Sequence, residues 1–398
     1  MTATATVFPI HRERRLSEAD LVALWEGQRF PGEALRTREG RRFRVIYRGR
    51  RTGGPGPDFR DAVIATREEL LRGDVELHVR TSDFKRHGHQ RDPAYDSVVL
   101  HLVFEHDESA DTELSCGRRA PVAALNEWVD GQAVEIWRWL ELPVRWREPC
   151  HTAVERLGDQ GAGAALDRLG DMRFRARSAG LAKVIRGGAD ADALVWSGIV
   201  EALGYGGQRE LMAVVAAGVN WADLRAALAG QRAAERRVGA MAKLTAALEA
   251  GRLRVPLVLR PLRPANRPEA RVKAAAVLAS RFAAGGILGF LWPLVLEAAG
   301  GSASALIAAL TVSDLVGRAR AIEILTNAIL PVIAATGEDS LAEAAYRALP
   351  LPLRYGAVKH IHSALDGEVP LTARRQQGML YLLKQYCTQG GCGKCPLS

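Results

Sequence analysis

The sequence contains little cysteine and no long apolar segment, and each absence excludes a class of protein. Five cysteines, unevenly placed in 398 residues, are too few for a small scaffold held by disulfides. The most apolar run, Ala283–Leu296, has about 14 residues and is interrupted by glycines and a proline, so it is too short to span a bilayer and is typical of a buried helix. The first twenty residues lack the apolar core of a signal peptide. We therefore expect a soluble cytoplasmic protein.

Positive charge is in excess, with a net charge of +9 and a pI of about 9.6. This balance favours an anionic partner, most commonly nucleic acid, although an arginine-rich and alanine-rich composition also arises from a GC-rich genome. Residues 36–60 hold nine arginines against only Glu39 and Asp58. We predict that part of this run contacts the phosphate backbone; the alternative is a solvated, arginine-rich hairpin. The predicted nucleic-acid-binding residues are Arg41, Arg42, Arg44, Arg48, Arg50 and Arg51.

The chain changes character near residue 150. Residues 1–150 predict a mixed α/β domain, with one helix near Ala19–Phe30 followed by strands. Residues 151–385 predict an all-α domain, because alanine- and leucine-rich segments recur and strand-like alternation is scarce. The proline-rich stretch Arg252–Pro268 is expected to be an irregular connector or a surface for a polyanion. The expected helical segments are Gly161–Val184, Ala191–Leu203, Trp221–Leu228, Ala233–Ala250, Ala270–Phe282, Ser302–Ala309, Leu315–Ala335 and Ser340–Leu349. Residues 386–398 form a third, cysteine-rich segment. The predicted strands are Phe43–Tyr47, Ala62–Ala65, Val75–Arg80 and Val98–Phe104, the last nearly all apolar and therefore central in the sheet.

Two carboxylates in the first domain are spaced as a metal site requires. Asp58 follows a glycine- and proline-rich turn and opens one strand, and Glu76 lies inside the next strand. His78 is two residues after Glu76, so both side chains point to the same face of a strand. Acidic oxygens can hold a divalent cation while a nitrogen base positions the attacking water. We predict that Asp58 and Glu76 hold Mg2+ or Mn2+ and that His78 or Lys85 orients the water.

Further polar residues follow the carboxylate pair closely. Three histidines occur within fifteen residues, whereas the whole chain has nine. The one in the apolar strand, His101, needs a buried partner, and Glu76 or His78 can supply it. Each histidine taken alone also fits a structural role. Glu26, in the first helix, is a candidate third acid or simply an exposed helix residue. The predicted supporting cluster is His87, His89, Gln90, Tyr95 and His101.

The C-terminus brings three thiols together within nine residues. Cys387, Cys392 and Cys395 lie in a glycine-rich segment followed by proline, a pattern that places thiolates around one point. The fourth ligand is expected to be Cys150, with Cys116 and His151 as alternatives. We predict a [4Fe-4S] cluster, with a structural Zn2+ or three unliganded thiols as the alternatives.

These residues also resemble known families. The Pro-Asp…Glu-x-His pattern resembles the PD-(D/E)xK motif of RecB-like nucleases, with His78 in place of the usual lysine. Gln90 and Tyr95 are similar to the Gln-x-x-x-Tyr element of those nucleases, with one residue more between them. One upstream cysteine and three near the C-terminus resemble the iron–sulfur staple of some members. The resemblance implies a restriction-endonuclease-like mixed sheet in the first domain and hydrolysis of phosphodiester bonds.

Longer stretches resemble the Domain of Unknown Function 2851 family of bacteria, over nearly the whole chain. The stretches that carry this resemblance are Gly-Pro-Asp-Phe at 56–59, Gly-Asp-Val-Glu-Leu-His at 73–78, Ser-Asp-Phe at 82–84, His-Gly-His at 87–89, Ala-Tyr-Asp-Ser-Val-Val-Leu-His at 94–101, Glu-Ala-Leu-Gly-Tyr at 201–205, Arg-Pro-Ala-Asn-Arg-Pro at 263–268, Gly-Arg-Ala-Arg-Ala at 317–321 and Gln-Gln-Gly at 376–378. The family implies no function. The sequence therefore predicts a metal-dependent nuclease acting on DNA or RNA. The alternatives are a non-catalytic nucleic-acid-binding adaptor on a degenerate nuclease core, and a different, histidine-rich metal hydrolase.

Overall fold

The protein is described by a computed structural model that covers residues 16–30, 35–142, 150–204, 208–255, 267–365 and 367–398. These residues fall into two compact units. Unit 1 contains the chain up to Ala162 together with Gly356–Val369 and Leu382–Ser398, and unit 2 contains Gly163–Tyr355 and Pro370–Tyr381. Both the cysteine-rich C-terminal segment and Cys150 belong to unit 1.

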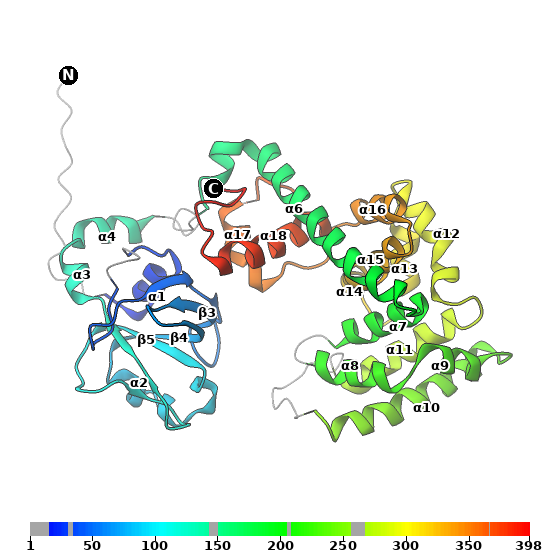
Figure 1. Cartoon of the computed structure of the whole chain (residues 1–398), viewed down its shortest axis with the longest axis horizontal. Helices are drawn as coiled ribbons and strands as arrows, with labels where there is room; N and C mark the ends of the chain where they lie inside the picture. Colours follow the sequence, from blue (N-terminus) through cyan, green and yellow to red (C-terminus); the bar gives the residue numbers. More distant parts are fainter. Residues whose placement is uncertain (1–15, 31–34, 143–149, 205–207, 256–266, 366) are drawn as a thin grey trace. The chain divides into compact units, whose positions relative to one another are not determined.

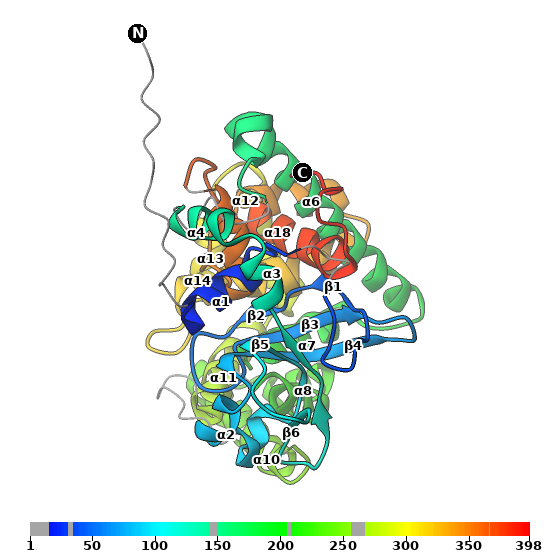
Figure 2. The same ribbon diagram turned by 90° about the vertical axis from the view of Figure 1, so that its left-hand side faces the viewer.

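Unit 1 is built on a mixed sheet whose strands lie in the order β1-β3-β4-β5-β8. Figure 2 labels the first four of these strands. The strands are β1 (Arg44–Tyr47), β2 (Arg50–Arg51), β3 (Phe59–Ala65), β4 (Leu70–Arg80), β5 (Val98–Glu105) and β8 (Val122–Ala124). The pairs β1–β3, β2–β3 and β3–β4 are antiparallel, whereas β4–β5 and β5–β8 are parallel. The predicted mixed sheet is confirmed, and the apolar β5 has a hydrogen-bonded neighbour on each side, as its composition predicts.

The two faces of this sheet have different surroundings. Val75 and Leu77 point into an apolar core formed with helices α1 (Glu18–Glu26), α3 (Asn126–Asp130) and α4 (Ala133–Glu141), which Figure 1 shows above the strands. Because side chains alternate along a strand, Glu76 and His78 point to the opposite face. That face carries α2 (Asp83–Arg86), the short helices η1 (His89–Arg91) and η2 (Pro93–Tyr95), and the hairpin β6 (Thr112–Glu113)–β7 (Arg119–Ala120).

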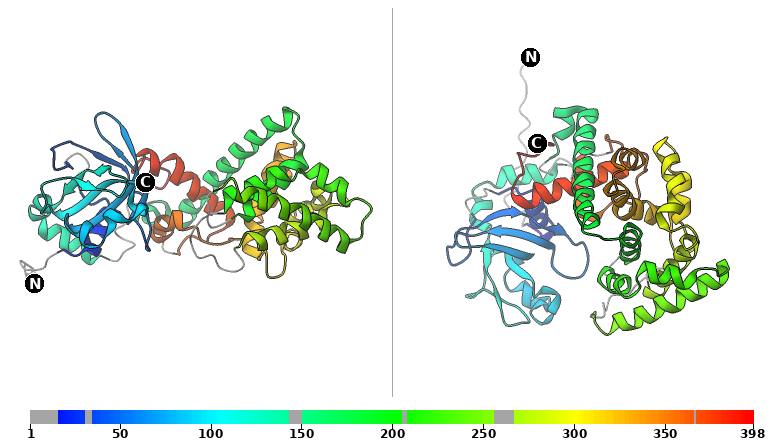
Figure 3. Two further views of the ribbon diagram at one scale, coloured as in Figure 1. Left: turned by 90° about the horizontal axis from the view of Figure 1, so that it is seen from below. Right: turned by 45° about the vertical axis from the view of Figure 1, so that its right-hand side comes forward.

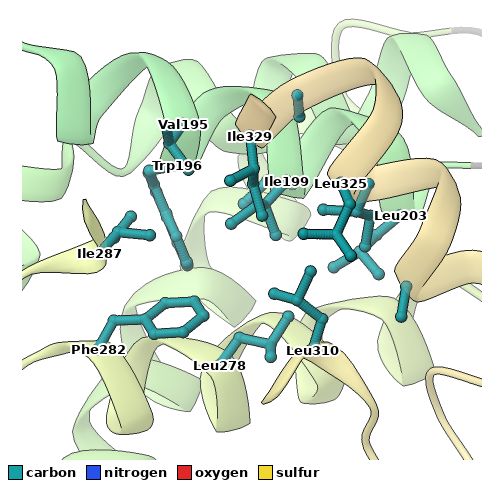
Figure 4. Close-up of a cluster of buried hydrophobic side chains, with 14 of the residues drawn as sticks. Val195, Trp196, Ile199, Leu203, Leu278, Phe282, Ile287, Leu310, Leu325 and Ile329 are labelled. Carbon is teal, nitrogen blue, oxygen red and sulfur yellow. The ribbon is translucent and has the colours of Figure 1, made fainter. Parts of the chain in front are cut away.

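Unit 2 is helical, as predicted for this part of the chain. Trp196 and Ile199 of α7 (Ala191–Leu203) pack against Phe282 of α11 (Pro268–Phe282) and the neighbouring helices in one apolar core (Figure 4). The Trp196 indole nitrogen donates to the carbonyl oxygen of Val219 at 2.9 Å, so this buried indole has its polar atom satisfied. The other helices wholly in unit 2 are α8 (Arg209–Gly218), α9 (Trp221–Leu228), α10 (Ala233–Arg252), α12 (Ile287–Ala299), α13 (Ser304–Leu310), α14 (Arg318–Ile324), α15 (Leu330–Ala335) and α16 (Asp339–Arg347).

Most predicted helical segments match observed helices closely. The predicted single segment from Leu315 to Ala335 instead contains a π-helical turn, η4 (Leu325–Ile329), between α14 and α15. The apolar run near residue 290 forms the helix α12, part of the apolar core. Residues 256–266, within the expected irregular connector, lie outside the described residues.

Two long helices, α6 (Ala153–Arg186) and α18 (Ala373–Gln385), each contribute residues to both units (Figures 1 and 3). Within unit 2 they approach closely, because a Cβ atom on Gly378 would lie 2.1 Å from the carbonyl oxygen of Leu166. Arg374 Nε donates to Asp171 Oδ1 at 2.7 Å across this contact. The two helices are therefore held in a fixed register at that point.

A search of the described residues for membrane spans found no single helix that is long and apolar enough. Two pairs of consecutive helices, each bent at a short break, are long and apolar enough for a membrane span by length and composition alone. They are Arg209–Gly218 with Trp221–Leu228 and Pro268–Phe282 with Ile287–Ala299.

Candidate metal centre

Asp58 and Glu76 are held together by reciprocal hydrogen bonds with the backbone. The Asp58 amide donates to Glu76 Oε2 at 3.0 Å, and the Leu77 amide donates to Asp58 Oδ2 at 3.1 Å. Asp58 lies at the entry to β3, and Glu76 is in the adjacent antiparallel β4. The sequence spacing therefore does bring these two acids to one place.

His78 is oriented by a chain of buried polar side chains. Its Nδ1 lies 3.0 Å from His101 Nε2, and His101 Nδ1 lies 2.6 Å from Thr112 Oγ1. His101 is on β5 directly opposite Glu76, and its side chain is fully buried. We assign Nδ1–H of His101 as donor to Thr112 and Nδ1–H of His78 as donor to His101. This tautomer leaves the Nε2 lone pair of His78 directed into the cluster, which is how outer residues orient a metal-binding histidine.

His87 and His89 are brought to the same point by a tight turn after α2. Gly88 between them has φ of +80°, a conformation that glycine adopts without strain. The start of α2 is fixed by Ser82, whose amide and hydroxyl donate to the Asp107 carboxylate at 2.9 and 2.6 Å. The His89 ring stacks on Tyr95, with ring centroids 4.0 Å apart.

The three imidazoles and one carboxylate form a set of metal-binding donors. Ring nitrogens of His78, His87 and His89 all lie within 4.8 Å of one another, and His78 Nε2 is 3.1 Å from His87 Nδ1. Glu76 Oε1 lies 3.5 Å from His89 Nε2 and 3.7 Å from His78 Nε2. Three imidazole nitrogens and a carboxylate oxygen match the donors that a divalent transition metal prefers. His87 is exposed while His78 is buried, so the cluster has one side open to solvent.

The electrostatics of the cluster also favour binding of a cation. Burial, followed by the nearby Asp58 charge, raises the pKa of Glu76 from 4.5 to about 9, and burial raises the pKa of Asp58 to about 6. Burial and the neighbouring histidines lower the pKa of His78 to about 2, so it is the neutral imidazole that binds metals. Gln90 Oε1, beside the cluster in sequence, is buried with no hydrogen-bond donor among the described residues. A bound cation would compensate the two carboxylates.

Lys85 and Glu26 have ion-pair partners of their own. Lys85 Nζ lies 3.0 Å from Glu108 Oε1, and more than half of its side chain is exposed. Glu26 Oε2 lies 3.3 Å from Arg51 Nη1. The Glu76 carboxylate therefore has imidazoles beside it. Among the described side chains, no lysine ammonium pairs with it.

The predicted arginines are divided between different parts of unit 1. Arg50 pairs with Asp61 at 3.2 Å, and the charge of Arg51 acts on the Asp58 carboxyl and lowers its pKa against the larger effect of burial. Arg41 and Arg42 instead line a cavity of about 540 Å3. Leu71 and Leu100, which belong to the apolar core of unit 1, line the same cavity. Arg44 is exposed on β1, whereas Arg48 is buried.

The C-terminal cysteines lie against β1 in unit 1. Gly390 approaches Ile46, and Arg156 Nη2 donates to the Leu397 carbonyl oxygen at 2.8 Å. Loss of solvent and the nearby Cys395 and Cys392 thiols raise the pKa of Cys387 to about 12, so the three thiols influence one another. Their sulfur atoms are less tightly gathered than the imidazole nitrogens, as only the histidines meet the 4.8 Å separation in the part of the chain described. Cys150 is half-buried and Cys116 is exposed.

Sequence reasoning missed the residues that hold the histidines in place. Thr112 lies in a two-residue strand and Asp107 in a connecting segment, where no periodicity marks them. The helpful signal was the lone histidine in the apolar β5, because a buried imidazole requires polar neighbours.

Replacing Glu76 with glutamine is expected to stabilise the metal-free protein at pH 7 by about 1 kcal/mol or more. The amide oxygen can still accept from the Asp58 amide, but the buried, raised-pKa carboxyl is gone. Because folded Glu76 keeps a proton that the unfolded chain loses, the stability of the parent protein should fall as pH rises from about 4.5 towards 9. Urea unfolding with a chelator, across that pH range, measures both effects. Glu105→Gln, at an exposed glutamate of β5, is the control, and equal behaviour of both variants would contradict the burial argument.

Comparison with protein-family models gives a match to the family described as "Protein of unknown function (DUF2851)", over residues 18–244. This span includes every residue of the histidine and carboxylate cluster and more than half of the chain. Neither the curated proteins nor the solved structures gave a significant match. The chain therefore belongs to the DUF2851 family.

Proposed function

We propose that this protein is a metal-dependent hydrolase that cleaves phosphodiester bonds in nucleic acid. The observation that carries the proposal is the convergence of His78, His87 and His89 beside the buried Glu76 carboxylate. A buried carboxylate that lacks a cation partner is costly, and metal binding supplies one. Asp58, linked to Glu76 through the backbone, is the second carboxylate of the site.

The donor set favours a transition metal over magnesium. Mg2+ prefers oxygen ligands and retains water, whereas imidazole nitrogens suit Zn2+, Mn2+ or Fe2+. Mn2+, predicted from the carboxylate pair, remains compatible with the site, and Zn2+ joins it because of the three imidazoles. His78, His87, His89 and Glu76 would hold the ion.

A phosphodiester substrate is supported by the charge around the cluster. Arg51 is about half exposed and its charge acts on Asp58, while Arg86, mostly exposed, acts on His78. Arg51 also pairs with Glu26 and Arg86 with Asp83, and their exposed guanidinium groups can bind phosphate oxygens near the site. The positions of Asp58 before β3 and Glu76 in β4 also agree with a restriction-endonuclease-like core, which we propose for the sheet of unit 1.

Each side chain of the site has a role in this proposal. A bound divalent ion supplies a Lewis acid and lowers the pKa of a water molecule. His101 and Thr112 keep the His78 ring in one tautomer. Tyr95 holds the His89 ring by stacking. Asp58 is the carboxylate available to accept a proton from the attacking water.

The proposal is tested with the full chain, stripped by a chelator and then supplied with Zn2+, Mn2+ or Mg2+ separately. The substrates are bis(p-nitrophenyl) phosphate, single-stranded DNA, duplex DNA and RNA. We expect hydrolysis that depends on Zn2+ or Mn2+ and stops on renewed chelation. Stoichiometric metal binding without hydrolysis of any of these substrates would reject the activity while preserving the metal site.

A non-catalytic adaptor is the second candidate, and the position of Lys85 favours it. The nuclease motif that this sequence resembles uses a lysine, and Lys85 pairs with Glu108 instead. An adaptor would bind nucleic acid through the exposed arginines and use the metal, if any, for structure. Nucleic-acid binding that survives chelation, without cleavage under any metal, distinguishes this function.

We also propose that the C-terminal cysteines hold a [4Fe-4S] cluster or Zn2+ together with Cys150. One support is that the thiols of Cys392 and Cys395 are close enough to raise the pKa of Cys387. Another is that Cys150 lies in unit 1 together with the three C-terminal cysteines. A link between positions 150 and 395 closes a loop of more than 200 residues, which restricts the unfolded chain strongly. Cys116 and His151 are the alternatives to Cys150 as the fourth ligand.

Cys387→Ser is expected to lower the free energy of unfolding by about 2 kcal/mol or more, as loss of a metal crosslink does. Anaerobic purification followed by absorbance, iron, sulfide and zinc analysis identifies the occupant. Cys116→Ser is the control and should retain metal and stability. Anaerobic protein with no metal, and with unchanged stability in the Cys387 variant, would reject this site.

A further inference from the structure

Unit 2 contains a cavity of about 430 Å3 that the proposed hydrolase site does not involve. Its walls come from α6, α7, α8, α14, η4 and α18, together with Gly204 and Tyr355. Ala202, Ala328 and Leu380 give it an apolar part. The volume is within the range that small-molecule sites occupy.

Four arginines line this cavity, against two glutamates. Arg209 pairs with Glu201 at 2.6 Å, and Arg320 pairs with Glu323. Both glutamates of the cavity are therefore paired with an arginine. Four guanidinium groups against two carboxylates leave a surplus of two positive charges. The two arginines responsible for the surplus are Arg173 and Arg177.

Arg173 and Arg177 are one helical turn apart on α6, so their side chains share one face. Neither has a carboxylate within ion-pair distance among the residues described in the structure. Arg177 is an exposed residue, yet partial burial lowers its pKa, and the like charges of Arg173 and Arg209 lower it further against the opposite effect of Glu201. Two like charges held together without an anion are unfavourable, and an anionic ligand removes the cost.

Hydrogen bonds also fix the position of the Arg173 side chain in the cavity wall. Arg173 Nε donates to Gln377 Oε1 at 2.6 Å, and Gln377 is buried. Gln377 Nε2 in turn lies 3.4 Å from the Tyr355 hydroxyl, another cavity residue. Because this contact uses Nε of Arg173, the outer nitrogens of the guanidinium remain for a ligand.

We propose that this cavity binds a phosphate monoester, with Arg173 and Arg177 as the ligands of the phosphate group. A phosphate monoester carries a charge of roughly −1.5 to −2 near pH 7, which matches the surplus of two positive charges. Guanidinium forks bind phosphate oxygens in pairs. The cavity is larger than phosphate alone requires, and its apolar part suits the organic portion of such a ligand.

The test measures binding to the full chain by isothermal titration calorimetry in the presence of EDTA, so that metal at the histidine cluster does not contribute. The probes are inorganic phosphate, adenosine monophosphate and citrate. We expect saturable binding of both phosphate probes, and tighter binding of adenosine monophosphate if an organic monoester is the natural ligand. Binding of inorganic phosphate with exclusion of adenosine monophosphate would assign the site to free phosphate.

Arg177→Gln should weaken phosphate-probe binding at least about tenfold, because one charged hydrogen-bonding group is lost. Arg177→Lys should give a smaller loss, because the charge remains and the fork is lost. The control is Arg168→Gln, at an exposed arginine of α6 that does not line the cavity, and it should bind within twofold of the parent. Thermal unfolding shows that each variant is folded. Absence of saturable binding up to about 10 mM, equal loss in the Arg168 and Arg177 variants, or equal affinity for citrate would overturn the proposal.

Discussion

Replacement of His89 by alanine is expected to weaken binding of Zn2+ or Mn2+ at least about 100-fold, since losing a direct ligand costs no less than losing an outer partner. His89 is suited to this test because its side chain is partly exposed and its ring borders both Glu76 and Tyr95. His78 is almost fully buried, so its removal would disturb the fold as well. Metal content after dialysis and competition with a chromogenic chelator measure the affinity.

His106→Ala is the matched control for this result. His106 follows β5 and its Nδ1 lies 2.7 Å from Thr81 Oγ1, outside the group of nitrogens that converge. It should keep the parent protein's metal content and its affinity for Zn2+ or Mn2+. Equal loss of metal from both variants would mean that the affinity depends on general stability and not on the cluster.

Replacement of Asp58 by asparagine is expected to lower hydrolysis of phosphodiesters at least about 1000-fold, as loss of a charged group in the reacting site does. The shape of the side chain is kept and its oxygen can still accept from the Leu77 amide. Binding of nucleic acid should change little, because it depends on arginines and salt. Steady-state rates and filter binding of the same preparation separate the two effects.

The control for Asp58→Asn is Asp61→Asn in β3, the strand that follows Asp58. Asp61 is three-quarters exposed and pairs with Arg50. Its φ of +61° is one that asparagine also adopts readily, so the substitution adds no strain. Full activity of the Asp61 variant is expected. Cleavage that persists undiminished in the Asp58 variant would place the chemistry elsewhere or indicate a contaminating nuclease.

Patterns of apolar residues were sufficient to predict much of the fold. The segment Val98–Phe104 is apolar on both faces, which is typical of an internal strand, and β5 is one. The segments Ala191–Leu203 and Trp221–Leu228 are helices with the predicted ends, because Asp190 and Asn220 cap their first turns through side-chain hydrogen bonds. Local sequence contains these signals.

The site was predictable only where a local rule applies. The two-residue spacing of Glu76 and His78 places them on one face of β4, and the structure shows both in the cluster. The ring of His87 joins them through a turn around Gly88, and the position of Thr112 depends on a short hairpin. These contacts depend on tertiary packing, which cannot be predicted from the periodicity of apolar residues along the sequence. Lys85 illustrates the same limit, because its partner Glu108 follows a different strand.

Local sequence patterns also could not predict that the C-terminal segment belongs to unit 1. Residues 382–398 are more than 200 positions from the end of the sheet in sequence, yet Gly390 packs near Ile46 of β1. Such contacts follow from the path of α6 and α18, whose close approach at Gly378 has no composition signal. The cysteine spacing indicated a ligand cluster, but not the surface against which it lies.

The central claim is that Glu76, His78, His87 and His89 form a metal site, and a crystal structure of the full chain soaked in Zn2+ or Mn2+ tests it most directly. Anomalous scattering locates the ion without assumption about its ligands. We predict a strong peak at about 2.0–2.2 Å from nitrogens of His78, His87 and His89 and from an oxygen of Glu76, separate from any peak at the C-terminal cysteines. A crystal saturated with either metal that shows no peak among these side chains would contradict the account.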